Sequence, residues 1–337
     1  MKKLICKSNK IFLAGGNGMV GSAIKKKLIE HNYGKFEHHG IILNPSRKEL
    51  NLTDSIAVKL WMKKNKPDIV IIAAAKVGGI MANSKYPVDF LLNNIKIQTN
   101  VIEAAWLCGV KRLLFLGSSC IYPNNYQEPI KEEFLLSGPL EKTNEYYAIA
   151  KISGIKLCDS LRYQYDFDAI SLMPTNLYGP KDNYHMNDSH VMAALIRKFM
   201  HAKKYNLTSV KCWGTGFPKR EFLYVDDLAE AVIFCLENWN PYSKSSPKDL
   251  FGKPLTLLNI GTGIDISIKK LAELISNIVG FNGEIVWDNS KPDGTRRKLL
   301  DIKKISELGW KAEVNLEQGI KNTIRDLKLN KEKYDFL

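Results

Sequence analysis

Hydrophobic positions in the first half of the chain fall into two kinds of segment. Short apolar runs predict β-strands, and longer segments with apolar residues every three to four positions predict amphipathic helices. The predicted strands are Lys10–Ala14, Gly40–Leu43, Ile69–Ala73, Leu113–Gly117 and Ala169–Met173. The predicted helices between them are Met19–Glu30, Ser55–Lys64, Val88–Leu107 and Tyr146–Gln164. This alternation is typical of an α/β fold, in which helices cover both faces of a parallel sheet.

The pattern changes after Pro174. Glycine, proline and asparagine become more frequent and the loops lengthen. Apolar periodicity still predicts three further helices, at Asp226–Glu237, Ile268–Val279 and Leu316–Leu327. We therefore expect a second, smaller unit of short strands and helices that is partly interleaved with the first.

Composition excludes several classes of protein. The chain has 45% hydrophobic and 25% charged residues, which is the balance of a globular protein. Its longest apolar run, Ile69–Ala75, has the length of a strand and falls far below the roughly 18–20 residues that a membrane-spanning helix needs. The six cysteines are scattered without the spacing of common zinc sites, so we expect no metal and reduced thiols in a cytoplasmic protein.

The net charge of +14 is compatible with nucleic-acid binding, but the sequence does not favour it. No basic segment is interleaved with aromatic residues, and no known nucleic-acid module is visible. Clusters such as Lys25–Lys27 and Lys63–Lys64 fall on predicted helices and are expected to be solvated. We expect the positive surface to attract anionic small molecules, and no nucleic acid or membrane partner.

A glycine-rich segment lies between the first predicted strand and the first predicted helix. Glycines let the backbone approach a pyrophosphate, and the following helix offers free amides and the positive end of its dipole. Because the segment joins a strand to a helix in a βαβ series, we predict a dinucleotide-binding loop. Its residues are Gly15, Gly16, Asn17, Gly18, Met19, Val20 and Gly21.

The end of the second predicted strand indicates which dinucleotide binds. NAD sites usually place a carboxylate there to accept a hydrogen bond from the ribose 2′-hydroxyl. Here the segment Asn44–Lys48 contains Arg47, and a guanidinium can bind a 2′-phosphate with two hydrogen bonds. We therefore predict NADPH as the cofactor. The alternative is that Arg47 and Lys48 are only solvated loop charges.

A tyrosine and a lysine four residues apart form the candidate catalytic pair. Tyr147 and Lys151 have helical spacing, which places them on one face, one turn apart. An ammonium near the phenol is expected to lower its pKa from about 10 and prepare it for proton exchange with a carbonyl. Ser118, at the end of the fourth predicted strand, can donate a further hydrogen bond to the same carbonyl oxygen.

With these features the chain resembles the GDP-L-fucose synthases, which are epimerase/reductases of the extended short-chain dehydrogenase/reductase family. The resemblance extends from about Lys10 to Trp310. It is carried by long matching segments, namely Gly18–Ile24, Ala73–Ile80, Leu116–Pro123, Met173–Pro180 and Lys291–Thr295.

The resemblance implies a reaction in two stages on a nucleotide sugar, GDP-4-keto-6-deoxy-D-mannose. Carbons C3 and C5 are inverted, and NADPH then delivers hydride to C4 to give GDP-L-fucose. It assigns the inversion to Cys120 and His190 and the reduction to Tyr147, Lys151 and Ser118. It also implies cofactor contacts from Leu116, Gly117, Ser118, Ser119, Lys151, Pro174, Thr175, Asn176, Leu177 and His190, and substrate contacts from Lys198, Trp213, Arg220, Lys291 and Asp293.

Three positions depart from the family pattern. Asn17 and Asn44 stand where basic residues are frequent, which weakens the expected preference for NADPH over NADH. Lys198 replaces an arginine, so the charge is kept but the bidentate geometry is lost. Structural interpretations also exist for three predicted site residues: Cys120 as a buried thiol, His190 as a residue at a helix N-terminus, where its pKa would be lowered, and Trp213 as part of the core.

Other functions on the same fold are a 4-epimerase, a 4,6-dehydratase and a non-catalytic dinucleotide sensor. A dehydratase similar to these carries an acid pair near the catalytic serine or threonine, whereas this chain has Ser119 and Cys120. A 4-epimerase retains NAD through turnover and needs no cysteine–histidine pair. A sensor typically loses the tyrosine–lysine pair that this chain retains.

The same sequence features predict how the chain is divided into domains. We expect a Rossmann-type, doubly wound NADP-binding domain at residues 1–179 with returning segments at about 221–263. Residues 180–220 and 264–337 are expected to form the nucleotide-sugar substrate domain. The family resemblance further suggests a homodimer formed through the helices near Val88–Leu107 and Tyr146–Gln164.

Overall fold

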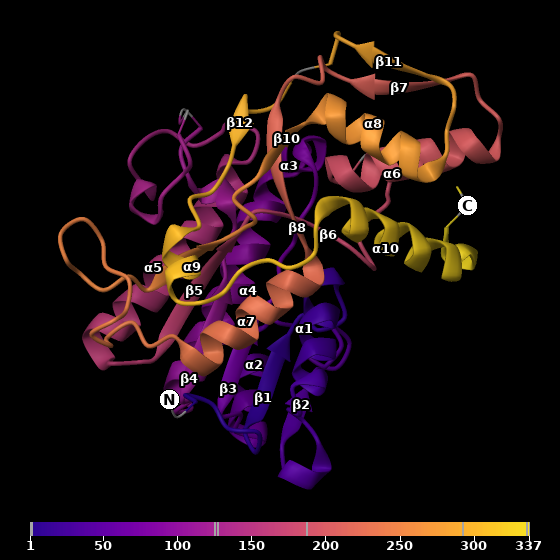
Figure 1. The fold of residues 1–337 in the computed structure, drawn as a ribbon. Helices are drawn as coiled ribbons and strands as arrows, with labels where there is room; N and C mark the ends of the chain where they lie inside the picture. The colour runs from indigo at the N-terminus through magenta and orange to yellow at the C-terminus, as the bar shows by residue number, and fades with distance from the viewer. Residues whose placement is uncertain are drawn as a thin grey trace.

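The computed structural model describes residues 3–124, 126, 128–186, 188–291, 293–334 and 336. Its main element is a six-stranded sheet in the order β2-β1-β3-β4-β5-β9, and every neighbouring pair is parallel (Figure 1). The strands are β1 Lys10–Ala14, β2 Ile41–Leu43, β3 Ile69–Ile72, β4 Arg112–Leu116, β5 Ala169–Pro174 and β9 Leu257–Ile260. Parallel strands need long crossovers, which the helices between them provide.

Helices cover both faces of this sheet because successive strand residues point to opposite sides. Ile11 and Leu13 of β1 belong to a hydrophobic cluster with α1 and α7, whereas Phe12 and Ala14 belong to a cluster with α2, α4 and α5. The five helices are α1 Met19–Glu30, α7 Val225–Asn238, α2 Ser55–Asn65, α4 Pro87–Leu107 and α5 Glu145–Tyr165. The predicted Rossmann-type, doubly wound α/β fold is therefore confirmed.

The predicted elements are present with bounds that differ by at most two residues. Elements that the apolar pattern did not predict individually are α6 Val191–Lys204, the short helices α3 Ile80–Lys85 and α9 Lys303–Glu307, and the strands after β5. Most of them are too short to be predicted from the sequence, since three to five residues give little periodicity. Among the described residues, no helix has the length and apolar character needed to cross a bilayer.

A third hydrophobic cluster is formed by elements that lie beyond the carboxyl ends of the six strands (Figure 1). It joins α6 with α8 Ile268–Val279 and α10 Leu316–Leu329. Two small sheets accompany it. In one, β8 Lys219–Tyr224 pairs with β6 Asn176–Tyr178, β10 Asp265–Ser267 and β12 Arg297–Lys298, and in the other β7 Ser209–Trp213 pairs with β11 Glu284–Asp288.

The order of the large sheet reverses between β1 and β3, which are neighbours although β2 lies between them in sequence. At such a switch point the loops that follow the two strands diverge and leave a crevice, where ligands of open α/β sheets bind. The glycine-rich loop follows β1 and therefore lies at this position.

Candidate active site

The glycine-rich loop turns sharply between β1 and α1. Gly15 has φ +89°, and a Cβ there would lie 2.6 Å from the backbone nitrogen of Ala74, so the loop passes too close to the chain after β3 for any side chain. A Cβ at Gly21 would collide with the carbonyl oxygen of Gly15, which explains the glycine at this position. No described side chain caps α1 at Gly18, so its first amides remain available to a pyrophosphate.

Tyr147 and Lys151 lie one turn apart on α5, as predicted, with the Lys151 Nζ 5.9 Å from the centre of the Tyr147 ring. Lys151 is buried, and its Nζ donates a hydrogen bond of 2.7 Å to the carbonyl oxygen of Leu116 at the end of β4. Ser118 follows two residues later, where its Oγ accepts a hydrogen bond from the Cys120 amide (3.4 Å). Lys151 thus connects α5 to the strand end that presents Ser118 and Cys120.

Burial changes the acidity of the pair. It lowers the pKa of Lys151 to about 8, and the nearby Cys120 partly opposes this shift. It also raises the pKa of Tyr147, and the charge of Cys120 adds to the rise. The expectation that the ammonium lowers the Tyr147 pKa is therefore wrong for this structure, because the cost of desolvating the phenolate dominates. Tyr147 is a protonated phenol at neutral pH, the form that can donate a proton.

Cys120 and His190 approach a common cation, Lys298. Burial raises the pKa of the Cys120 thiol, whereas Lys298, a hydrogen bond from Ser118 and Lys151 act in the opposite direction. His190 is the N-cap residue of α6, and its side chain is exposed. The surrounding protein atoms still displace water from the imidazole and lower its pKa, and the Lys298 charge lowers it further. The predicted place at a helix N-terminus and the predicted direction of the shift are both confirmed.

The candidate substrate residues gather around Trp213, whose ring is 48% exposed and is therefore not part of the core. The Nζ atoms of Lys198 and Lys291 lie 5.4 and 5.6 Å from the centre of this ring. Asp293 accepts hydrogen bonds from the backbone nitrogen and the Oγ1 of Thr215 (2.9 and 2.6 Å). Pro292, within the segment Lys291–Thr295 singled out above, lies outside the described residues.

Arg220 on β8 lies near this group. It is partly exposed, burial lowers its pKa, and the charges of Asp293 and Glu141 oppose that shift. Strand pairing places Arg220 beside Lys298 of β12. This pairing connects the cations near Trp213 with the cation near Cys120.

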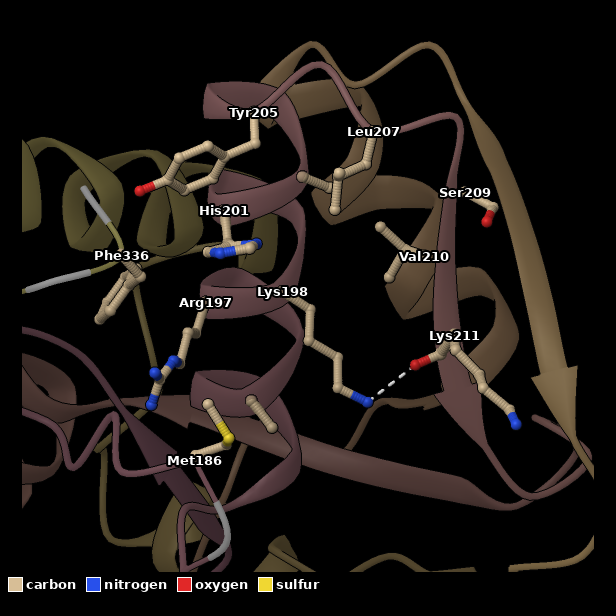
Figure 2. Close-up of a pocket in the computed structure, with 12 residues that line it drawn as sticks. Met186, Arg197, Lys198, His201, Tyr205, Leu207, Ser209, Val210, Lys211 and Phe336 are labelled. Carbon is tan, nitrogen blue, oxygen red and sulfur yellow. Dashed lines mark hydrogen bonds between the residues drawn. The ribbon is translucent and has the colours of Figure 1, made fainter.

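A pocket between α6 and β7 adjoins this group (Figure 2). Lys198 reaches from α6 to the carbonyl oxygen of Lys211, to which its Nζ donates a hydrogen bond of 2.8 Å. Arg197 and His201 of α6 also line the pocket, as does Tyr205, the residue that follows this helix. The pocket is therefore rich in cations and aromatic rings, and it lies apart from Tyr147.

The remaining candidate cofactor residues lie at the carboxyl ends of the central strands. Residues 116–119 end or follow β4, and residues 174–177 run from the last residue of β5 into β6. Asn176 Nδ2 and Thr175 Oγ1 both donate hydrogen bonds to the carbonyl oxygen of Glu221 on β8 (2.8 and 3.3 Å). Arg47 lies apart from them, exposed on the turn after β2.

Sequence reasoning missed two residues that organise the site. Lys298 lines a cavity with Cys120 and Glu141, and its place in the basic run Arg296–Lys298 was the available signal. Glu221 is fully buried, and its carboxylate accepts hydrogen bonds from the amides of Thr262, Gly263 and Leu300 (2.6, 2.7 and 3.0 Å). No sequence signal separated Glu221 from an ordinary strand residue.

Comparisons with known proteins agree with this arrangement. The model of the NAD dependent epimerase/dehydratase family matches residues 11–245. The chain is 51% identical to "Probable GDP-L-fucose synthase 1" of Oryza sativa subsp. japonica over 320 residues, which cover 95% of this chain and 92% of the relative.

Solved structures show the same likeness over almost the whole chain. A GDP-6-OMe-4-keto-L-xylo-heptose reductase from C. jejuni has a TM-score of 0.88 and 37% identity, covering 97% of this chain and 99% of its own. A GDP-L-fucose synthetase from Naegleria fowleri bound to NADP has a TM-score of 0.84 and 26% identity, covering 98% of both chains. The chain therefore belongs to the NAD dependent epimerase/dehydratase family, within the extended short-chain dehydrogenases/reductases.

Proposed function

We propose that this chain is a GDP-L-fucose synthase, an NADP-dependent oxidoreductase that also has epimerase activity. It inverts C3 and C5 of GDP-4-keto-6-deoxy-D-mannose and reduces C4 to give GDP-L-fucose. The observation that carries the proposal is the position of Cys120. Its thiol shares one site with the Tyr147–Lys151 pair and Ser118, so a base for inversion and an acid for reduction can act on one ketone.

Reduction needs a proton donor beside the ketone. NADPH, when bound, supplies the hydride that adds to C4. Tyr147 donates its proton to O4 as the carbonyl becomes an alkoxide, and its raised pKa keeps it protonated until then. Ser118 donates a hydrogen bond to the same oxygen, and the buried Lys151 ammonium favours the phenolate that remains.

Inversion needs a base and an acid on opposite faces of the sugar. The C4 carbonyl acidifies the hydrogens on C3 and C5, and polarisation of O4 by Tyr147 and Ser118 stabilises the enolate. At each centre in turn, Cys120 as a thiolate removes the carbon-bound proton and His190 as an imidazolium returns a proton from the other face. Between the two inversions Cys120 loses its proton to solvent and His190 takes one up. Lys298 assists because its charge opposes the burial that raises the Cys120 pKa.

The guanosine diphosphate is held by the group around Trp213. Lys198, Arg220 and Lys291 supply positive charge to the diphosphate, and the half-exposed Trp213 ring offers a flat apolar surface. Asp293 fixes the adjacent loop through Thr215. The pocket of Figure 2 lies next to Lys198, so the nucleoside has room on that side.

The cofactor site fits a dinucleotide. The uncapped start of α1 and the close approach at Gly15 and Gly21 leave a backbone cradle that a Cβ would fill. The candidate residues from 116–119 and 174–177 follow strands of the same sheet edge, where the nicotinamide half would lie above Tyr147. Arg47 is proposed to contact the 2′-phosphate.

The domain division and the homodimer belong to the same proposal. Residues 1–179 with 221–263 form the cofactor domain, and residues 180–220 with 264–337 form the substrate domain. The neighbouring helices α4 and α5 expose apolar side chains, including Val88, Leu92, Tyr146 and Ile149, which supports a dimer through this pair. The cytoplasmic location stays a prediction from the sequence.

The test is turnover of GDP-4-keto-6-deoxy-D-mannose with NADPH in heavy water. We expect one NADPH oxidised per sugar, GDP-L-fucose as product and deuterium at C3 and C5. A product reduced at C4 without deuterium would identify a reductase that does not invert its substrate. Exchange without NADPH consumption would identify an epimerase. Neither exchange nor oxidation would support the sensor.

A further inference from the structure

Inversion at two carbons requires that Cys120 and His190 be reset once within each turnover. The first inversion leaves Cys120 as a neutral thiol and His190 as a neutral imidazole, whereas the second needs the thiolate and the imidazolium again. The sum of the two changes is one proton lost by Cys120 and one gained by His190. A group that exchanges protons with both residues would therefore shorten the interval between the inversions.

Lys298 has the position and the chemistry of such a group. It lines a cavity together with Cys120, Glu141 and Asn144. The cavity has a volume of about 30 Å³, which is room for about two water molecules. Among the residues that the structure describes, no acceptor takes a hydrogen bond from the Lys298 Nζ and no carboxylate forms an ion pair with it. Its ammonium is therefore available for proton exchange.

The start of α6 lies close to the strand that carries this lysine. The Gly79 amide donates a hydrogen bond of 2.9 Å to the carbonyl oxygen of Asp188, shortly before α6. A Cβ at Gly294, shortly before β12, would lie 3.6 Å from the Cδ1 of Ile80. The segment that contains Gly79 and Ile80 thus connects β12, where Lys298 lies, with the helix whose N-cap is the candidate acid.

The environment of Lys298 favours exchange with both partners. Burial lowers the pKa of the Lys298 ammonium and raises that of the Cys120 thiol, so the lysine loses much of its usual advantage in holding a proton. Displacement of water also lowers the pKa of His190, and the Lys298 charge lowers it further. Such an imidazole is protonated slowly from water near neutral pH, so a neighbouring ammonium speeds this step.

We propose that Lys298 carries protons between Cys120, His190 and solvent in the interval between the two inversions. The Lys298 ammonium gives one N–H proton to the imidazole, and the resulting amine takes the S–H proton of Cys120. Lys298 ends as an ammonium again, Cys120 as a thiolate and His190 as an imidazolium, and no electron is transferred. Water in the cavity exchanges the hydrogens of the ammonium, so the proton that Cys120 lost reaches solvent. This inference rests on the proposed function, which requires two inversions.

The test is deuterium uptake by GDP-4-keto-6-deoxy-D-mannose on the full chain in heavy water with NADP+, which cannot reduce the ketone. Samples are quenched during a single turnover with enzyme in excess, and mass spectrometry counts the deuterium atoms per sugar. Lys298→Arg keeps the charge, but a guanidinium does not give up its proton. The first deuterium should therefore enter within about threefold of the wild-type rate and the second at least about tenfold more slowly, so that singly labelled sugar accumulates.

Lys298→Ala with an added amine provides a second measurement. Methylammonium should restore entry of the second deuterium, whereas tetramethylammonium, which has the same charge but no proton to give, should not. Lys303→Arg makes the same exchange at an exposed position of α9 and should label the sugar as the wild type does.

Three outcomes would overturn the inference and leave the proposed function standing. They are normal entry of both deuterium atoms in Lys298→Arg, equal slowing of both in this variant, and equal restoration of Lys298→Ala by the two cations. Each would show that Lys298 supplies only charge or packing. A wild-type protein that takes up no deuterium would instead contradict the proposed function itself.

Discussion

The burial of Lys151 predicts how the reduction step depends on pH. Its pKa lies at about 8, so about nine-tenths of the side chains are protonated at pH 7 and about one-tenth at pH 9. The ammonium is needed because it stabilises the phenolate that Tyr147 becomes after giving its proton to O4. We therefore expect hydride transfer at pH 9 to run at about one-tenth of its rate at pH 7.

The assay follows NADPH oxidation between pH 6 and pH 10, with ordinary NADPH and with NADPH deuterated at the transferred position. The isotope effect identifies the pH range in which hydride transfer limits turnover, and only there is the comparison made. Lys151→Arg is the matched variant, because a guanidinium stays charged up to about pH 12. It should lose the decline near pH 8 even if its absolute rate is lower.

Unfolding driven by Lys151 cannot imitate this decline. The pKa of lysine is about 10.4 in an unfolded chain and about 8 in this fold, so the unfolded state binds more protons between these values. Stability from this residue therefore rises with pH across that window. A thermal melting curve at pH 7 and pH 9 checks the point. Hydride transfer that stays constant from pH 7 to pH 10, or a decline retained in Lys151→Arg, would refute the reasoning.

Three further variants separate the roles of the site residues. Tyr147→Phe removes the proton donor and should slow NADPH oxidation at least about a hundredfold while fluorescence titration still detects NADPH binding. Cys120→Ser should abolish deuterium uptake at C3 and C5, since a serine hydroxyl is too weakly acidic to act as the base. Normal labelling would show that Cys120 only packs in the site. Lys298→Met should raise the Cys120 pKa and so slow deuterium uptake at C3 and C5 at least about tenfold. Arg296 is an exposed residue near Lys298 in the sequence, and Arg296→Met should leave this uptake at the wild-type rate.

The sequence predicted those parts of the fold that depend on local pattern. The large parallel sheet follows from buried apolar runs separated by periodic helices, and the loop at Gly15–Gly21 follows from its place between β1 and α1. The spacing of Tyr147 and Lys151 likewise required only a helix. Each of these features lies within one stretch of chain, so no knowledge of distant contacts was needed.

Features that depend on strand register and burial were out of reach. Lys298 meets Cys120 because β12 pairs with β8, which are about 80 residues apart, and a two-residue strand leaves no periodic signal. The Asn44 contact with Gly16 depends on how far β2 extends before its loop. The direction of the Tyr147 pKa shift was mispredicted because the spacing to Lys151 was visible, whereas the surrounding burial was not.

The charge of Cys120 affects the acidity of the reducing pair. A thiolate at Cys120 raises the pKa values of Tyr147 and Lys151, so the phenol holds its proton more tightly while a base is present. Once Cys120 has become a neutral thiol, that charge is gone and Tyr147 becomes a better acid. Proton donation from Tyr147 to O4 is therefore easier when Cys120 is a neutral thiol than when it is a thiolate. The base of the inversion and the acid of the reduction are thus electrostatically coupled.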